Sequence, residues 1–176
     1  MADNERRMLV EQARAGRAEA WEMLLRSLYP RLAAYAARRS GPDAADDIVA
    51  ETMTRAVESI DNFRMDDSDF DGWVFGIARR VSADHFRKEA RAARPSPNSE
   101  VPSPPVDHDL SLAEDYAEVR AAFELLRPED REVLELRVIA GLTADQAAVV
   151  LGMRPGTVRV AQSRALARLR ELLKRG

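Results

Sequence analysis

The feature that most limits how this chain can fold is a proline-rich stretch in its middle. Five prolines fall among the twelve residues from Arg94 to Pro105, with almost no apolar side chain to bury. Such a composition cannot form part of a packed core, so we expect an extended, semi-flexible tether. With 176 residues in all, each flank has room for one small domain. We therefore predict a domain at 1–93, a linker at 94–110 and a second domain at 111–176.

Both flanks show helical and not alternating apolar periodicity, so we predict an all-α fold. A first helix is expected from Asp3 or Asn4 to Gly16. A second should run from Ala18 to Leu28, where Pro30 breaks it or starts a third that ends near Gly41. Asp43 is expected to cap the next helix, whose apolar stripe is Ile48, Val49, Thr52, Met53, Ala56, Val57 and Ile60. That helix should end at Asp61 and Asn62, and a further one carries Phe70, Trp73, Val74, Ile77 and Val81.

The second flank carries two sequences with the spacing of a capping box. Ser111 with Glu114 predicts a helix that reaches Leu126, and Pro128 should open another that ends at Gly141. Thr143 with Gln146 predicts a short helix to Leu151. Pro155 and Gly156 then lead into a long, basic final helix.

The last two helices, with the Gly152 turn between them, form a predicted helix-turn-helix. Ala147, Ala148, Leu151 and Val158 should face inward, so that the second helix presents its N-terminal half to a major groove, where arginine can bond guanine edges. Its expected outward residues are Arg159, Val160, Gln162, Ser163 and Arg164, with Arg168, Arg170 and Lys174 farther along. An ordinary helical hairpin with a solvated basic face is the competing interpretation.

The helix after residue 70 combines aromatic and basic side chains, a combination that can receive unstacked bases and hold their backbone. By its spacing with Phe70 and Ile77, Trp73 itself is expected to belong to the core. The preceding helix, from Asp46 to Ile60, has an acidic outer face with Asp47, Glu51 and Glu58. Such faces are usually only solvated, but they also dock basic partners.

Charge alternates in blocks along the chain. Residues 74–94 carry six basic and two acidic side chains, and residues 152–176 carry seven basic and one acidic, whereas 43–71 carry ten acidic and two basic. This pattern predicts two surfaces that face a polyanion and one with a different partner.

Little in the sequence favours catalysis. Cysteine is absent, which excludes disulfides and thiol chemistry. His85 and Glu89 form a local pair, and no phosphate loop, nucleophile elbow or zinc pattern is found. We expect a protein that is not an enzyme, with no cofactor and no metal, without a membrane helix or signal peptide, and cytoplasmic.

Taken together, these motifs resemble the extracytoplasmic-function group of bacterial RNA polymerase sigma factors, most closely those of actinobacteria. The stretch from Asp46 to Ala56 resembles the helix with which that family binds core polymerase. The resemblance implies contacts with the clamp helices of the largest polymerase subunit by Asp47, Ile48, Val49, Glu51, Thr52 and Arg55.

The stretch from Gly72 to Arg79, with Asp84 and Arg87, resembles the segment that melts and reads the minus-ten promoter element, and the loop from Arg64 to Asp69 resembles the one that captures a flipped base. The implied minus-ten residues are Arg64, Met65, Asp66, Ser68, Phe75, Arg79, Arg80 and Arg87. Those implied for duplex reading at minus thirty-five are Arg154, Thr157, Arg159, Val160, Gln162, Ser163 and Arg164.

Two departures from the family pattern bear on promoter choice. Many relatives have asparagine where this chain has Arg80, and Val160, Ala161 and Ser163 replace residues that are often polar, basic or aromatic. The resemblance further implies partners: core polymerase through its clamp helices and flap, promoter DNA, and an anti-sigma factor that holds the chain inactive. Two alternatives remain open, a regulator that binds an operator without polymerase and a helical adaptor that contacts only proteins.

Overall fold

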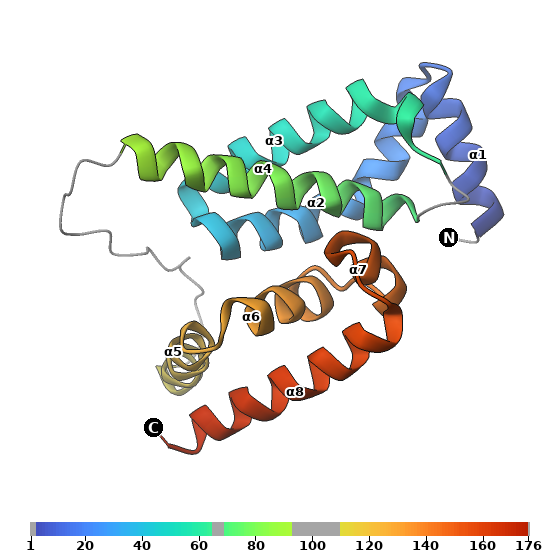
Figure 1. Ribbon diagram of the computed structural model, residues 1–176. Helices are drawn as coiled ribbons and strands as arrows, with labels where there is room; N and C mark the ends of the chain where they lie inside the picture. The colour runs from blue at the N-terminus through green and yellow to red at the C-terminus, as the bar shows by residue number, and fades with distance from the viewer. Residues whose placement is uncertain (1–2, 65–68, 93–109, 176) are drawn as a thin grey trace.

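The computed structural model describes residues 3–64, 69–92 and 110–175, and every regular element in those ranges is helical (Figure 1). This confirms the predicted all-α fold of two small helical domains. The N-terminal domain contains α1 (Asp3–Arg14), α2 (Ala18–Ser40), α3 (Pro42–Ser59), the short 3₁₀ turn η1 (Ile60–Asn62) and α4 (Phe70–Ala92). The C-terminal domain contains α5 (Leu110–Glu124), α6 (Pro128–Leu134), the π turn η2 (Glu135–Ile139), α7 (Ala144–Leu151) and α8 (Pro155–Leu173).

Three predicted boundaries are wrong. Helix α2 continues through Pro30, because its apolar face of Leu24, Leu28, Leu32 and Tyr35 is buried along the whole helix while Pro30 lies exposed. Burial of four large side chains outweighs the cost of an interior proline, about 3 kcal/mol. The residue before α3 is Gly41 and not Asp43, since Pro42 already occupies the first helical position. Helix α5 begins at Leu110, so Ser111 lies inside its first turn and not at the cap.

Gly41 separates two helices that pack side by side. Its φ of +82° is open to glycine without strain, and its amide donates to the carbonyl of Ala37 at the end of α2. The chain therefore reverses between α2 and α3 without an intervening loop. Figure 1 shows α3 and α4 running alongside α2.

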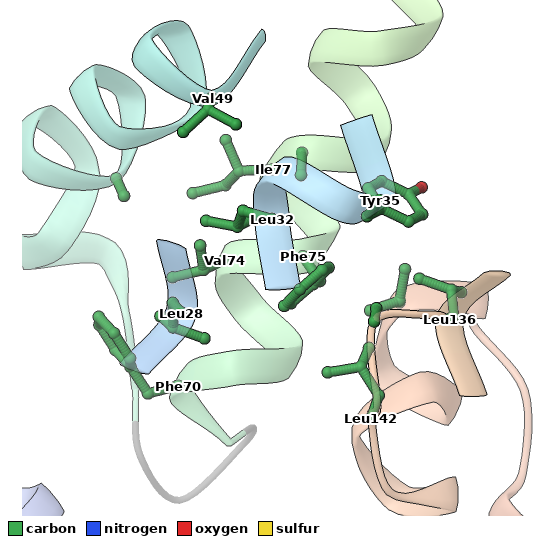
Figure 2. Packing of buried hydrophobic residues seen from close by; sticks show 14 of the residues in the cluster. Leu28, Leu32, Tyr35, Val49, Phe70, Val74, Phe75, Ile77, Leu136 and Leu142 are labelled. Atoms are coloured by element: carbon green, nitrogen blue, oxygen red, sulfur yellow. The ribbon is translucent and has the colours of Figure 1, made fainter. Parts of the chain in front are cut away.

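The main hydrophobic core is shared by the two domains. In Figure 2, Phe70, Val74, Phe75 and Ile77 of α4 lie among Leu28, Leu32 and Tyr35 of α2, and Leu136 and Leu142 from the C-terminal domain lie beside them. Tyr35 meets Phe75 edge to face, with ring centroids 5.6 Å apart, a favoured aromatic geometry. A smaller cluster in the C-terminal domain contains Phe123, Leu126, Leu134 and Ala165, with Leu166, Leu169 and Leu172 against it.

The π turn η2 was not predicted from the sequence. The Ala140 amide donates to the carbonyl of Glu135, five residues back, at 2.8 Å, which inserts one extra residue into the helical ladder. It places Leu136 fully in the core, and Glu135 on the same stretch is buried. No helix among the described residues has the length and apolar character needed to cross a membrane.

Candidate nucleic-acid and protein interfaces

The helix-turn-helix is built by α7, a glycine turn and α8. Thr143 and Gln146 form the predicted capping box at the start of α7: the Gln146 amide donates to the Thr143 hydroxyl at 3.2 Å, and the Thr143 amide donates to the Gln146 side-chain oxygen at 2.8 Å. Gly152 adopts the left-handed conformation, with φ of +65°, and ends α7. Ala147, Ala148 and Val158 are buried at the crossing of the two helices, so small side chains bring them close together, as predicted.

The N-terminal part of α8 projects a row of side chains into solvent. Of the residues predicted to contact the minus-thirty-five element, six are exposed: Arg154, Thr157, Arg159, Val160, Ser163 and Arg164. Gln162 is half-buried, and its side-chain oxygen accepts a hydrogen bond from Arg137 at 2.8 Å. Arg168, farther along, is paired with Asp130 of α6. The free face of α8 is therefore the face near its start.

Helix α4 divides its predicted minus-ten residues between two sides. Arg80 and Arg87 are exposed on one side, and Arg64 is exposed before α4. On the other side Phe75 is fully buried, and Arg79 pairs with Glu132 of α6 at 2.7 Å. Phe75 thus offers no surface to DNA in this arrangement and instead packs α4 against the hydrophobic core. Met65, Asp66 and Ser68 lie outside the described residues.

A groove of about 410 Å³ lies between the end of α3 and the exposed side of α4. It is lined by Arg55, Glu58, Ser59, Asn62, Trp73, Ile77 and Arg80. Trp73 is half-buried and packs on Phe63 and Phe70, at centroid distances of 4.9 and 5.7 Å. The prediction that Trp73 belongs to the core is thus confirmed in part, while its groove side and Asn62 were missed as candidate site residues. The aromatic-basic character of α4 could have indicated the groove side of Trp73, whereas Asn62 lies in η1 and carried no such signal.

Helix α3 presents an acidic outer face. Asp47 and Glu51 are exposed, and Arg55 pairs with Glu51 at 2.7 Å and with Asp84 of α4 at 3.4 Å. Ile48, Val49 and Thr52 are buried, and the Thr52 hydroxyl donates to the carbonyl of Ile48 at 2.6 Å. In this arrangement the buried three hold α3 in the core, while Asp47 and Glu51 are exposed and Arg55 is half-buried on the outer face.

Asp71 and Asp69 organise the start of α4. Asp69 accepts hydrogen bonds from the Asp71 amide at 2.8 Å and from the Gln146 side chain of α7 at 2.9 Å. The carboxylate of Asp71 is buried, and it pairs with Arg6 of α1 through one oxygen and with Arg31 of α2 through the other. A buried carboxylate is tolerable only with such partners, so these contacts orient the first turn of α4.

Four charged groups gather where α2 and α4 meet α6 and η2. Arg39 donates a hydrogen bond to Glu135 at 2.8 Å and lies 3.4 Å from the Glu132 carboxylate. Glu132 also forms an ion pair with Arg79. The hydrogen bond to Glu132 raises the pKa of Arg79, so this guanidinium stays charged. Burial raises the pKa of the Glu135 carboxyl above its usual range, although Arg39 opposes the shift. Burial likewise raises the pKa of Tyr35 beside them.

Across the described ranges, no three His, Cys, Asp or Glu side chains come together in a way that could hold a metal ion. His85 stands 3.6 Å from Glu89 on the same helix, the local pair expected from the sequence.

Comparison with protein families gives two matches in the order of the two domains. The model for Sigma-70 region 2 matches residues 24–92, and the model for Sigma-70, region 4 matches residues 116–169.

Several curated proteins that are similar to this chain over most of its length are ECF RNA polymerase sigma factors. ECF RNA polymerase sigma factor BldN of Streptomyces coelicolor is 34% identical, over 98% of this chain and 67% of the relative. ECF RNA polymerase sigma factor ShbA of Streptomyces griseus is 33% identical, over 93% of each. SigD of Mycobacterium tuberculosis is 30% identical, over 93% of this chain and 81% of the relative.

Two solved structures are similar over most of the fold. CnrH in complex with the cytosolic domain of CnrY superposes with a TM-score of 0.71 at 28% identity, over 96% of both chains. The sigma factor RpoE in complex with the anti-sigma factor NepR from Bartonella quintana gives a TM-score of 0.66 at 28% identity, over 89% of this chain and 98% of that one.

Proposed function

The chain belongs to the ECF group of RNA polymerase sigma factors, and we propose that its surfaces divide promoter recognition and polymerase docking as follows. The N-terminal domain docks on core polymerase and reads the minus-ten element, while the C-terminal domain reads the minus-thirty-five element as duplex. The observation that carries this division is the exposed basic face at the start of α8, together with the basic-aromatic groove of α4. We place the domain boundaries as predicted, at 1–93 and 111–176.

At the minus-thirty-five element, the exposed face of α8 enters the major groove. Arg159 and Arg164 are long enough to bond the O6 and N7 acceptors of guanine in two-pronged fashion. Arg154 and Thr157, near the helix start, are suited to phosphate contacts that fix the register. Val160 supplies an apolar contact for a thymine methyl group. Gln162 contributes only if it leaves Arg137.

At the minus-ten element, the groove between α3 and α4 holds an unstacked base of the melted strand. The half-buried Trp73 ring offers a face for stacking, and Arg80 at the groove edge is placed to hold the backbone or a base edge. Arg64 and Arg87 extend the cationic surface on either side. Met65, Asp66 and Ser68 remain predicted members of the base-capturing loop.

Polymerase docking falls to the outer face of α3, through the exposed Asp47 and Glu51 and the half-buried Arg55. Ile48, Val49 and Thr52 act indirectly, by setting the orientation of this face from inside the core. The polymerase flap is the proposed site for the C-terminal domain. The similar sigma factor from Bartonella quintana was crystallised in complex with an anti-sigma factor, and we propose that an anti-sigma factor also controls this chain. The chain acts in the cytoplasm, where the polymerase works, and needs no catalysis of its own.

In vitro transcription tests this function. Core polymerase from a streptomycete is combined with and without the protein over a promoter library, and new start sites preceded by two spaced motifs are the expected result. Trp73→Leu should preserve apolar packing but weaken opening at the minus-ten element. A matched control is Phe86→Leu, since Phe86 is exposed on the same helix outside the groove. A well-folded protein that yields no new start sites, yet binds an operator without polymerase, would instead indicate a conventional regulator.

A further inference from the structure

Helix α1 lies ahead of the segment that matches Sigma-70 region 2, which begins at residue 24. Leu9 and Val10 on one side of α1 are buried in the main core. Figure 1 shows α1 beside the end of α3 and the start of α4, which are the two segments that supply the walls of the minus-ten groove. Two arginines of α1, Arg6 and Arg14, reach these segments.

Arg14, in the last turn of α1, holds the segment that follows α3. Its guanidinium donates to the carbonyl of Phe63 at 2.5 Å and to the carbonyl of Ile60 at 3.4 Å. The end of a helix leaves carbonyls without a partner inside the helix, and an arginine from another helix supplies the donor here. Asn62, which lines the groove, lies between these two residues in the sequence. Arg14 therefore fixes the main chain on both sides of Asn62.

Arg6, earlier on the same helix, holds the first turn of α4. It pairs with one oxygen of the Asp71 carboxylate, and its guanidinium lies 5.9 Å from the centroid of the Phe70 ring. Asp71 is buried, so its charge needs such a cationic partner. Trp73, which also lines the groove, lies two residues farther along α4. Arg6 therefore fixes the turn from which Trp73 projects.

An aromatic cluster joins the two walls. Phe63 is buried, and its ring lies 4.9 Å from the Trp73 ring and 5.6 Å from the Phe70 ring, the second pair edge to face. The rings of Phe70 and Trp73 lie 5.7 Å apart. The position of the Trp73 ring in the groove thus depends on Phe63 and Phe70. Helix α1 contacts the main chain of the first and the ring of the second.

We propose that α1 is a positioning element for minus-ten recognition, with Arg14 and Arg6 as its positioning residues. The two arginines fix η1 relative to the start of α4 and so hold the Trp73 ring in place for an unstacked base. Each acts through another residue, Arg14 through Phe63 and Arg6 through Asp71. A groove whose walls are fixed before DNA arrives loses less conformational entropy on binding than one that DNA must order. This inference rests on the proposed minus-ten function of the groove.

The fluorescence of the free, full-length protein tests whether α1 holds the groove wall. The chain has two tryptophans, so Trp21→Phe leaves Trp73 as the only one. In this background, Arg14→Met keeps an aliphatic side chain and removes the hydrogen-bond donors. We expect acrylamide to quench Trp73 more strongly in Arg14→Met than in its parent, and Arg14→Lys, which keeps a cationic donor, to fall between them. Arg17→Met is the matched control and should equal the parent, because Arg17 is exposed just after α1.

Promoter selection tests the consequence for DNA reading. Core polymerase with each variant is given a promoter library randomised at both elements, and the transcripts are sequenced. A base that is read typically favours its cognate by about tenfold or more. Arg14→Met should lose most of that preference at one minus-ten position, while its minus-thirty-five preferences stay those of the wild type. A merely structural role would lower transcription from all promoters alike and leave both sets of preferences unchanged.

The two measurements can each overturn the proposal. Equal quenching of Trp73 in Arg14→Met and Arg17→Met would show that α1 does not hold the wall. An unchanged minus-ten preference, or equal relaxation at both elements, would show that α1 has no specific role in reading the minus-ten element. If even the wild-type chain directs no transcription, the sigma assignment fails, and the quenching comparison then decides whether α1 holds the wall.

Discussion

Arg159 and Arg164 stand on the exposed face of α8 with no buried partner: Arg164 is exposed, and Arg159 only approaches Asp145 at 3.5 Å on the surface. Replacing either with alanine should weaken binding to the cognate minus-thirty-five element by ~1–3 kcal/mol and relax the preference for guanine at one position. Promoter selection from a randomised library, read by sequencing of the transcripts, measures this effect. Arg170→Ala is the matched control, since Arg170 is exposed farther along α8 and should affect all sequences alike.

Glu135 is expected to make the free energy of unfolding depend on pH through a single carboxyl group. Burial raises its pKa, with Arg39 opposing, so its contribution to stability is full below the ordinary carboxyl pKa and is lost as pH rises through the raised value. In Glu135→Gln, the free energy of unfolding should therefore fall less between about pH 5 and about pH 7.5 than in the wild type.

Urea unfolding at both pH values measures that difference, and Glu129→Gln serves as the control because Glu129 is exposed on the neighbouring α6. Effects of the substitution that do not depend on pH cancel in the comparison, so the change between the two pH values is the informative quantity. Parallel pH profiles for wild type and Glu135→Gln would contradict the assignment.

Residue by residue, the sequence predicted exposure well on α8 and poorly on α4. On α8 the outward and inward positions follow helical spacing alone, and Val158 and Ala165 are the buried ones. Phe75 could not be assigned in this way, because its burial depends on Leu136 and Leu142, which lie some sixty residues later and come from the other domain. The apolar residues of α3 were predicted as an inward stripe and also as a polymerase contact. Ile48 is buried as the stripe predicts and Val57 is exposed against it, while the polymerase contact stays a prediction.

Among the helices, the capping box of α7 is the best-defined local determinant. Thr143→Ala removes the hydroxyl that accepts from the Gln146 amide, so it should lower the free energy of unfolding by about 0.5–2 kcal/mol. Chemical denaturation measures the change. Thr54→Ala is the control, since the Thr54 hydroxyl only bonds the Ala50 carbonyl within an exposed helical turn, where alanine is a good helix former. Equal losses in both variants would remove the cap as the cause.

Several helix ends were predicted from local chemistry, although the caps expected at Asp43 and Ser111 were wrong, while features that depend on packing were not predicted. The caps at Thr143 and Gly152 and the proline starts at Pro128 and Pro155 are local signals, and the structure confirms them. The continuity of α2 through Pro30 and the π turn at Glu135–Ile139 depend on which side chains the rest of the molecule buries. No window of sequence a few residues wide contains that information.

At the scale of the whole molecule, Glu132 of the C-terminal domain joins the two domains through its pairs with Arg39 and Arg79. Glu132→Lys would set a third cation beside Arg39 and Arg79 in place of their shared carboxylate. We expect this variant to open, so that its radius of gyration in small-angle X-ray scattering exceeds the roughly 16 Å of the compact chain. Glu129→Lys makes the same change of charge on an exposed part of α6 and should stay compact. A compact Glu132→Lys chain would show that apolar packing alone keeps the domains closed.

The alternating charge blocks predicted separate surfaces, and the structure adds ion pairs between the two domains in which only Arg79 belongs to one of those blocks. Glu124 and Glu132 belong to the C-terminal domain, and their partners Arg38 and Arg79 lie some fifty to ninety residues earlier. Arg38 and Arg131 outweigh the effect of burial and lower the pKa of Glu124. A single sequence cannot show which of many arginines pairs with which glutamate, so the arrangement of the domains was beyond prediction.

The hydrophobic core that runs from one domain into the other makes the two halves poor candidates for free exchange. Phe75 and Tyr35 are covered by Leu136 and Leu142, so a hybrid that takes its second domain from a relative must keep apolar residues of matching shape at both positions. A change of side-chain size on one side of this contact requires a matching change on the other side. Substitutions on the outer face of α8 can alter promoter specificity without that requirement, whereas substitutions in the core shared by the domains have to be made in both domains together.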